Sequence, residues 1–199
     1  IGNPPYVNIF NIIDPDRTYF QENFETATNK SDLYSFFIEN SIKKLIKDEG
    51  ELGFIVSNTW ISIQSFEKLR SLLLNRMVIH KIVPLENGVF AEAVVVPIII
   101  IAKKKEPNKL DNIELIGFND NKFNLVRKIP QEVFRNSKNN VISISYDDKT
   151  NSIFEKMKSN TMELGKIGEF SLGVKTADND KFVSLKKIDD LSKKVIKGK

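Results

Sequence analysis

Over residues 1–105, amphipathic helical segments alternate with short runs of β-branched residues, and this alternation constrains the fold more than any other feature. Apolar residues at helical spacing predict two helices, one at 32–47 with Asp32 as its N-cap and one at 64–75. Short apolar runs predict buried strands at 52–56, 78–83 and 94–101. Helices between short buried strands are typical of an α/β domain with a mostly parallel sheet.

A boundary is predicted after residue 105, where this pattern changes. Residues 103–108, Lys-Lys-Lys-Glu-Pro-Asn, combine a charge run with a proline. Pro97 lies inside the strand run before this boundary, and because proline has no N–H, we expect a bulge or a shortened strand there. Beyond the boundary the pattern loosens, and we expect strands at 112–118 and 141–146 and a short helix at 151–158.

The composition excludes several kinds of site. The chain contains no cysteine, which excludes disulfides, thiolate metal sites and a cysteine nucleophile. A single histidine, His80, leaves little room for a histidine-rich metal site or a Ser-His-Asp triad, so we expect no metal. Its place in a β-branched run predicts a residue on a sheet face. No apolar run approaches the length of about 20 residues that a membrane helix needs, so we expect no membrane segment.

The net charge of +4 is a weak indicator of nucleic-acid binding. All of it lies in residues 106–199, and lysine greatly outnumbers arginine. Arginine is the better reader of phosphates and of guanine edges. The basic second part is therefore compatible with contacts to a DNA backbone, but it does not establish them.

The tetrapeptide Asn3-Pro4-Pro5-Tyr6 is the motif that carries chemistry. An exocyclic amino group is a poor nucleophile, because its lone pair is conjugated into the base. Two acceptors, the side-chain oxygen of Asn3 and the carbonyl of Pro4, would bind its hydrogens and offset the charge that develops as it attacks a methyl group. The proline pair stiffens the loop, and Tyr6 offers a ring face to a flipped base. For the bare tetrapeptide alone, a plain turn that leaves a strand is the favoured interpretation.

The sequence resembles the adenine-specific DNA methyltransferases of restriction–modification systems, in particular the fused endonuclease–methyltransferases of type IIG. Five blocks carry the resemblance in family order, at 2–6, 33–39, 53–60, 66–70 and 88–93. It implies S-adenosyl-L-methionine as methyl donor, double-stranded DNA as substrate, and the cytoplasm of a bacterium or archaeon as location. It also implies that Asn3 and Pro4 bind the target amino group, that Pro5 belongs to the catalytic loop, and that Tyr6 and Phe90 close on the two faces of the adenine.

Other positions in these blocks are expected to be structural. Tyr34 and Trp60 are expected to pack in the core, although both match family positions. Arg70 could contact phosphate, but a solvated helix face is the favoured interpretation. For Phe90, a core position at a strand end remains as open as the base-stacking role.

The chain departs from the family at the cofactor site. Its nine glycines contain no Gly-x-Gly turn, which the family places before the catalytic motif. The cofactor-binding residues are therefore unknown, and we expect an excised piece: the C-terminal half of a Rossmann-like methyltransferase sheet. Residues 1–105 would be a partial catalytic domain and 106–165 a linker. Residues 166–199 would begin a target-recognition domain, which the stretch 168–176 resembles.

Two alternatives stay open. The same tetrapeptide serves methyltransferases that modify protein glutamine or RNA adenine, because a planar amide and an aromatic amine make similar demands on the site. From a different class, the chain could be a catalytically inert DNA-binding fragment. Cofactor binding would separate the enzymes from the inert fragment, and the labelled product would separate the enzymes from one another. The DNA recognition sequence, any linked nuclease and the oligomeric state are not predicted.

Overall fold

The computed structural model describes residues 1–28, 30–85, 96–119, 122–144, 148–159, 161–162, 164–169, 183–184 and 186–191. The chain divides into two compact units, Ile1–Tyr146 and Asp147–Lys199. In the described part of the second unit, α5 (Asp148–Ser159) confirms the short helix expected at 151–158, and a 3-10 turn follows at Leu164–Lys166. Among the described residues, no helix is long and apolar enough to cross a lipid bilayer.

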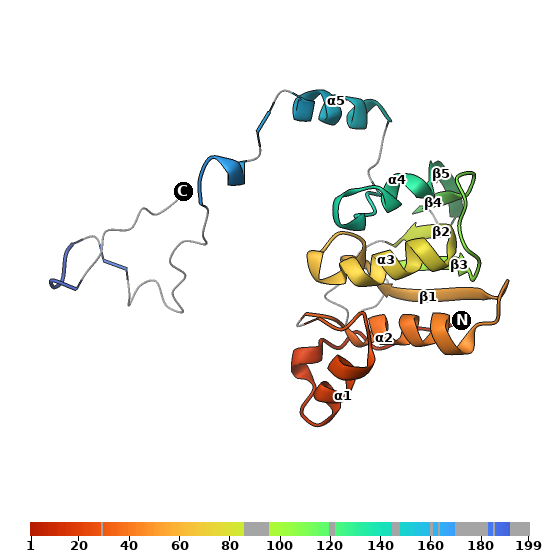
Figure 1. Ribbon diagram of the computed structural model, residues 1–199, viewed down its shortest axis with the longest axis horizontal. Helices are drawn as coiled ribbons and strands as arrows, with labels where there is room; N and C mark the ends of the chain where they lie inside the picture. The colour runs from red at the N-terminus through yellow and green to blue at the C-terminus, as the bar shows by residue number, and fades with distance from the viewer. Residues whose placement is uncertain are drawn as a thin grey trace. The chain divides into compact units, whose positions relative to one another are not determined.

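The first unit is built on a five-stranded sheet (Figure 1). Its strands are β1 (Glu51–Ser57), β2 (Val78–Pro84), β3 (Pro97–Lys103), β4 (Asn112–Asn119) and β5 (Lys122–Pro130). Their order across the sheet is β1-β3-β2-β4-β5. The strands expected at 52–56, 78–83 and 112–118 are confirmed, whereas β5 had no counterpart in the sequence analysis.

The expectation of a mostly parallel sheet is wrong. β3 pairs antiparallel with both β1 and β2, β4 pairs antiparallel with β5, and only β2 and β4 pair in parallel. Parallel neighbours need a long crossover, usually a helix. Between these strands, only the segment from β1 to β2 carries a helix in the described residues. β1 and β2 accordingly run in the same direction, and β3 lies between them in the opposite one.

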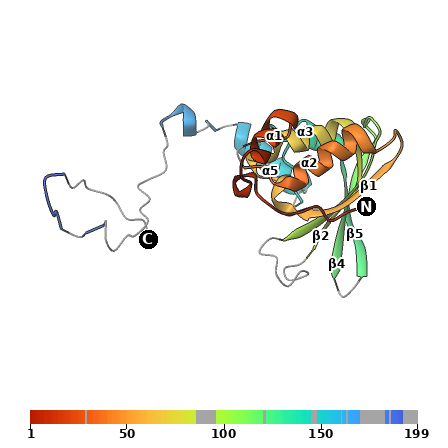
Figure 2. The same ribbon diagram turned by 90° about the horizontal axis from the view of Figure 1, so that it is seen from below.

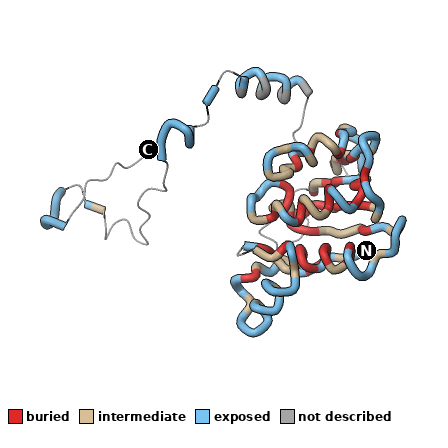
Figure 3. Tube along the Cα trace, viewed as in Figure 1, coloured by how far each residue is buried: buried red, intermediate tan, exposed pale blue. Residues whose placement is uncertain are grey.

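The helices described in the first unit are α1 (Asp16–Asn23), α2 (Leu33–Asn40), α3 (Glu67–Arg76) and α4 (Gln131–Arg135), and a π-helical turn, Ser41–Leu45, continues α2. Three of them, α2, α3 and α4, contribute to the core on one face of this sheet, and α1 contacts α2 through Phe20. Figure 2 shows α2 and α3 together on one side of the strands. Their buried residues, among them Ile38, Leu69 and Leu73, form one core with Val56, Ile100 and other strand residues, and Figure 3 shows this buried interior. The two predicted helices are confirmed, and α1 and α4 are additional.

The compact unit extends past the boundary predicted after residue 105, to Tyr146. The lysines at 103–105 lie at the end of β3 and do not mark a domain boundary. The Lys104 Nζ donates to the carbonyl of Ile46, and Lys103 forms an ion pair with Glu49. β4 and β5 then extend the same sheet. Ile142 is buried and its N–H donates to the carbonyl of Ile61, so residues 141–144 pack on this unit without forming the expected strand.

Pro97 is the first residue of β3, where a missing N–H breaks little of the ladder. The register shift of this region lies instead in β2, between Ile79 and Lys81. The expectation that the strand ends sooner is wrong, since β3 continues to Lys103, beyond the predicted end at residue 101. Residues 94–95 of the predicted strand lie outside the described residues.

Candidate functional site

The Asn3–Tyr6 motif begins where a short extended segment leaves the sheet. Gly2 pairs in parallel with β1: its N–H donates to the carbonyl of Gly53 at 3.0 Å, and its own carbonyl accepts from the N–H of Ile55 at 3.1 Å. A side chain at Gly2 would place its Cβ 3.0 Å from the ring of Phe54, so glycine permits this close approach. The motif therefore lies at the carboxyl edge of the sheet, where open α/β sheets bind their ligands.

The four residues of the motif differ in exposure. Asn3 and Pro5 are exposed, Pro4 is buried, and Tyr6 is half-buried. Within the described residues the Asn3 side chain makes no hydrogen bond. Pro4 is held by its packing and by its fixed φ, and the Pro5 that follows restricts the ψ of Pro4 and thereby the direction of its carbonyl. Asn3 and Pro4 thus offer one free and one rigid acceptor side by side.

Tyr6 is held by packing rather than by its hydroxyl. Its ring meets the ring of Tyr34 edge to face, with centroids 6.3 Å apart and planes at 88°. The Tyr6 hydroxyl is buried and has no hydrogen-bond partner in the described part of the chain. Burial accordingly raises the pKa of Tyr6 above its ordinary value. Part of the Tyr6 side chain remains exposed.

Tyr34 and Trp60 lie in the core, which confirms the structural roles predicted for them. The ring of Tyr34 stacks on Phe66, with centroids 5.6 Å apart and planes at 11°. Its hydroxyl lies 3.0 Å from the Thr59 Oγ1, which lies 2.9 Å from the Ser57 Oγ. Ser57 ends β1, so this chain of hydroxyls starts at the same edge of the sheet as the motif.

The exit from the motif is tied to the start of α2. The N–H of Leu33 donates to the carbonyl of Val7 at 2.9 Å, and the Asn8 Nδ2 donates to the Asp32 Oδ1 at 3.1 Å. Asp32 occupies the predicted N-cap position, but its side chain makes no capping hydrogen bond. Burial raises the pKa of Asp32, against the lowering effect of the Asn8 hydrogen bond. These two hydrogen bonds join the two ends of a lobe, residues 9–31, next to the motif.

A groove of about 470 Å³ opens next to the motif. The motif contributes Asn3, Pro4 and Pro5, and α2 contributes Phe37, whose side chain is 49% exposed. The rest of the lining comes from the π-helical turn and β1, including Ser41, Leu45, Ile46, Leu52 and Phe54. Its volume and mixed lining fit one side of a nucleoside-sized ligand. An exposed aromatic ring in this lining can stack on a purine.

Phe37 is a candidate that the sequence analysis missed. Neighbouring Phe36 is buried against Phe20 and Phe24, and a helical stripe that buries position 36 turns position 37 outward. The sequence could have indicated this, because two adjacent phenylalanines in a helix point in different directions and cannot both lie at the centre of its buried face.

Arg70 is neither a phosphate contact nor a solvated residue. It is 0% exposed, and its Nη1 donates to the carbonyls of Trp60 and Ile63, each at 2.7 Å. Its Nε and Nη2 donate to the carbonyl of Asn139 at 3.1 and 2.8 Å. The favoured expectation of a solvated face is wrong because the guanidinium is buried and its donors are satisfied by these backbone carbonyls. His80 lies half-buried in β2, as expected, and Phe90 lies outside the described residues.

The sheet order and the loop at its carboxyl edge define part of a Rossmann-like methyltransferase fold, and comparisons with known proteins agree. BpuSI, a type IIG restriction endonuclease of known structure, superposes with a TM-score of 0.53 at 16% identity, over 92% of this chain and 26% of that chain. Residues 1–90 match the model of the Eco57I restriction-modification methylase family.

Curated relatives carry the same assignment. The putative type II restriction enzyme and methyltransferase RM.MjaORFECS2P of Methanocaldococcus jannaschii is 34% identical over 118 residues, which make up 59% of this chain and 10% of that protein. The type II restriction enzyme and methyltransferase RM.Eco57I of Escherichia coli is 23% identical over 193 residues, 92% of this chain and 19% of that protein. The chain thus spans a fifth or less of these relatives.

Proposed function

We propose that the full-length protein carrying this chain transfers a methyl group from S-adenosyl-L-methionine to the exocyclic amino group of a flipped adenine in double-stranded DNA. One observation carries the proposal: at the carboxyl edge of the sheet, a free amide, a rigid carbonyl and a half-exposed ring follow one another in Asn3-Pro4-Pro5-Tyr6. The names of the relatives, which are restriction–modification enzymes and methyltransferases, support the same substrate class.

Each residue of the motif has a role in this reaction. The Asn3 Oδ1 and the Pro4 carbonyl accept the two amino hydrogens, which localises the lone pair on the nitrogen and offsets its developing positive charge. Pro5 keeps the Pro4 carbonyl directed at the base. Tyr6 stacks on the extruded adenine. Phe90 stays a proposal for the opposite face. When the nitrogen has taken the methyl group, it releases one proton to solvent, so no strong general base is required.

The end of the groove lined by Asn3, Pro4, Pro5 and Phe37 would hold the cofactor. S-adenosyl-L-methionine supplies an electrophilic methyl group on a sulfonium. The Phe37 ring offers a stacking face for the adenine of the cofactor. The adjacent motif would place the methyl acceptor next to the cofactor. The chain contributes only one side of this site, because its nine glycines include no Gly-x-Gly turn.

The second unit has a different proposed role. The proposed linker at 106–165 is reduced to its part beyond Tyr146, because residues 106–146 belong to the first unit. We propose residues 147–165 as the connection out of the catalytic sheet and 166–199 as the start of a target-recognition domain. This assignment rests on the resemblance in the stretch 168–176. The chromosomal substrate places the enzyme in the cytoplasm.

Methyl transfer from labelled S-adenosyl-L-methionine tests the proposal. The full-length protein is incubated with unmethylated duplex DNA, with RNA and with protein, and the labelled product is digested to identify the modified group. We expect label on adenine in DNA. Asn3→Ala should abolish most of the transfer while DNA affinity is retained, and Asn124→Ala, an exposed asparagine of β5, should match the wild type. Label on RNA or on glutamine would overturn the DNA assignment, and equal rates for Asn3→Ala and wild type would overturn the role of Asn3.

A further inference from the structure

Tyr34 is restrained on three sides although it faces no ligand. Its ring stacks on Phe66, its hydroxyl binds the Thr59 hydroxyl at 3.0 Å, and its edge meets the ring of Tyr6. Phe66 and Thr59 both come from the segment between β1 and α3, whereas Tyr34 comes from α2. The stack fixes the plane of the Tyr34 ring, and the hydrogen bond fixes its position within that plane.

Thr59 is itself anchored at the edge of the sheet. Its hydroxyl lies 2.9 Å from the Ser57 Oγ, and its N–H donates to the same oxygen at 3.3 Å. Ser57 is buried at the end of β1. The position of the Tyr34 hydroxyl is thus set by the sheet and not by α2 alone.

Tyr6 has no comparable restraint of its own. Its hydroxyl is buried without a hydrogen-bond partner in the described residues, so only packing holds the far end of its ring. Tyr6 packs against the main core cluster, and in the described part of the chain its ring contact is the perpendicular one with Tyr34. A shift of Tyr34 therefore passes directly to the ring that the proposed function stacks on the target base.

We propose that Tyr34, held by Thr59, is a positioning residue for methyl transfer: it keeps the Tyr6 ring at the angle at which a flipped adenine presents its amino group to the methyl donor. This inference rests on the proposed function and adds to it two residues that touch neither the base nor the cofactor. A misplacement of about 1 Å at a reacting centre costs up to about a hundredfold in rate. Loss of the hydrogen bond should accordingly lower kcat on the order of tenfold and leave the KM for DNA unchanged.

Three variants and a rescue test this in the full-length protein. Tyr34→Phe and Thr59→Val each remove the hydrogen bond while keeping the ring or the side-chain shape, and the double variant should lose no more kcat than either single variant. Thr59→Ser keeps the hydroxyl and should retain the wild-type kcat. Tyr19→Phe, which removes the hydroxyl of an exposed tyrosine of α1, is the matched control. Additive losses in the double variant, or a wild-type kcat in both single variants, would overturn the inference.

A readout independent of activity uses the 199-residue chain itself. Its four tyrosines are replaced biosynthetically by 3-fluorotyrosine, and a Tyr6→Phe variant assigns the fluorine resonance of position 6. We expect Thr59→Val to shift or broaden that resonance and Thr59→Ser to leave it unchanged. An unaltered resonance in Thr59→Val would overturn the positioning role. If the wild type methylates no adenine, the proposed function fails, and the resonance still shows whether Thr59 holds Tyr6.

Discussion

At the scale of single residues, a buried guanidinium without a carboxylate partner is the least expected feature of this molecule. Arg70 satisfies its donors on the carbonyls of Trp60, Ile63 and Asn139. Burial lowers the pKa of Arg70, while the charge of Glu67 raises it. The charge is tolerated because backbone carbonyls replace water around it. The Arg70 side chain also joins α3 to two turns that are distant from each other in sequence, one at Trp60–Ile63 and one at Asn139.

Replacement of this residue should therefore be costly. Arg70→Met fills a similar volume but leaves three carbonyls without their donor, and we expect it to lower the free energy of unfolding by about 3 kcal/mol. Urea denaturation of the chain measures the change. Arg76→Met, at an exposed position of the same helix, is the control and should stay within about 0.5 kcal/mol of the wild type. A small effect at Arg70 would mean that water replaces the guanidinium.

The hydroxyl of Tyr6 gives an opposite prediction. It is buried and unpaired within the described residues, so Tyr6→Phe should keep methyl transfer and should raise the free energy of unfolding by about 1 kcal/mol. Tyr6→Ala removes the ring and should weaken capture of the flipped base by about 1–3 kcal/mol. Transfer kinetics on the full-length protein, combined with denaturation, compare the two. Equal losses in both variants would show that the hydroxyl binds substrate.

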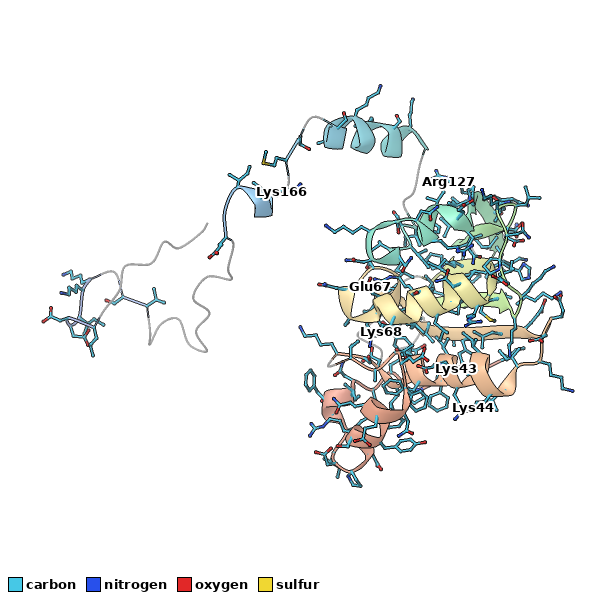
Figure 4. All side chains as sticks on the ribbon, in the orientation of Figure 1. Lys43, Lys44, Glu67, Lys68, Arg127 and Lys166 are labelled. Atoms are coloured by element: carbon cyan, nitrogen blue, oxygen red, sulfur yellow. The ribbon has the colours of Figure 1, made fainter. Side chains whose placement is uncertain are left out.

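At the scale of elements, the lobe of residues 9–31 is held on α2 by one buried carboxylate. Glu39 is 2% exposed and accepts from the N–H groups of Thr26 at 2.8 Å and Glu25 at 3.1 Å. Lys43, labelled in Figure 4 on the turn that continues α2, binds Glu39 at 2.7 Å and Glu25 at 2.8 Å. The rings of Phe20 and Phe24 pack on Phe36 beside this network.

This network makes the stability depend on pH. Burial raises the pKa of Glu39. The hydrogen bonds from Lys43 and from the backbone together lower it by more, so the pKa lies below its ordinary value. A carboxyl group whose pKa is lower in the folded than in the unfolded chain stabilises the fold at pH values above the unfolded-state pKa. This contribution is lost as the pH falls through the folded-state pKa. Glu39→Gln should therefore cost about 1–3 kcal/mol at pH 7 and show a smaller loss of stability below pH 4.5. Urea titrations at several pH values measure both, with the exposed Glu22→Gln as control; parallel pH curves for Glu39→Gln and wild type would contradict the argument.

The same elements show what the sequence could predict. The strands at 52–56 and 78–83 and the helix at 64–75 were predictable because a buried face imposes its own period on the apolar residues. β5 was not, since its residues are nearly all exposed and carry no such pattern. Strand direction depends on connections rather than on periodicity, which is why β3 was misassigned. The motif residues could be named, but no local pattern joins Tyr6 to Tyr34, or Tyr34 to the Thr59 and Phe66 that hold it.

At the scale of the whole first unit, the two faces of the sheet differ. Opposite the helices, a row of apolar residues crosses all five strands, with Ile55 paired to Ile99, Ile99 to Val83, and Ile116 to Leu125. The cluster on this face contains no helical residue among those that the structure describes. On β5, Phe123 and Leu125 are more than half exposed, and the Phe123 ring packs on Phe118. Figure 2 shows this side of the strands free of the helices of the unit.

An apolar face of this kind should associate with copies of itself in the isolated chain. We expect sedimentation velocity to show concentration-dependent association of the 199-residue chain. Leu125→Lys and Phe123→Lys should shift it toward the monomer, because each places a charge in the apolar row at little cost to folding. Leu110→Lys changes a still more exposed leucine in the loop before β4 and should leave the association unchanged. Monomers at all concentrations, or equal effects of the three variants, would show that this face does not drive association. The apolar row from Ile55 to Leu125 would then stay in contact with solvent in the isolated chain.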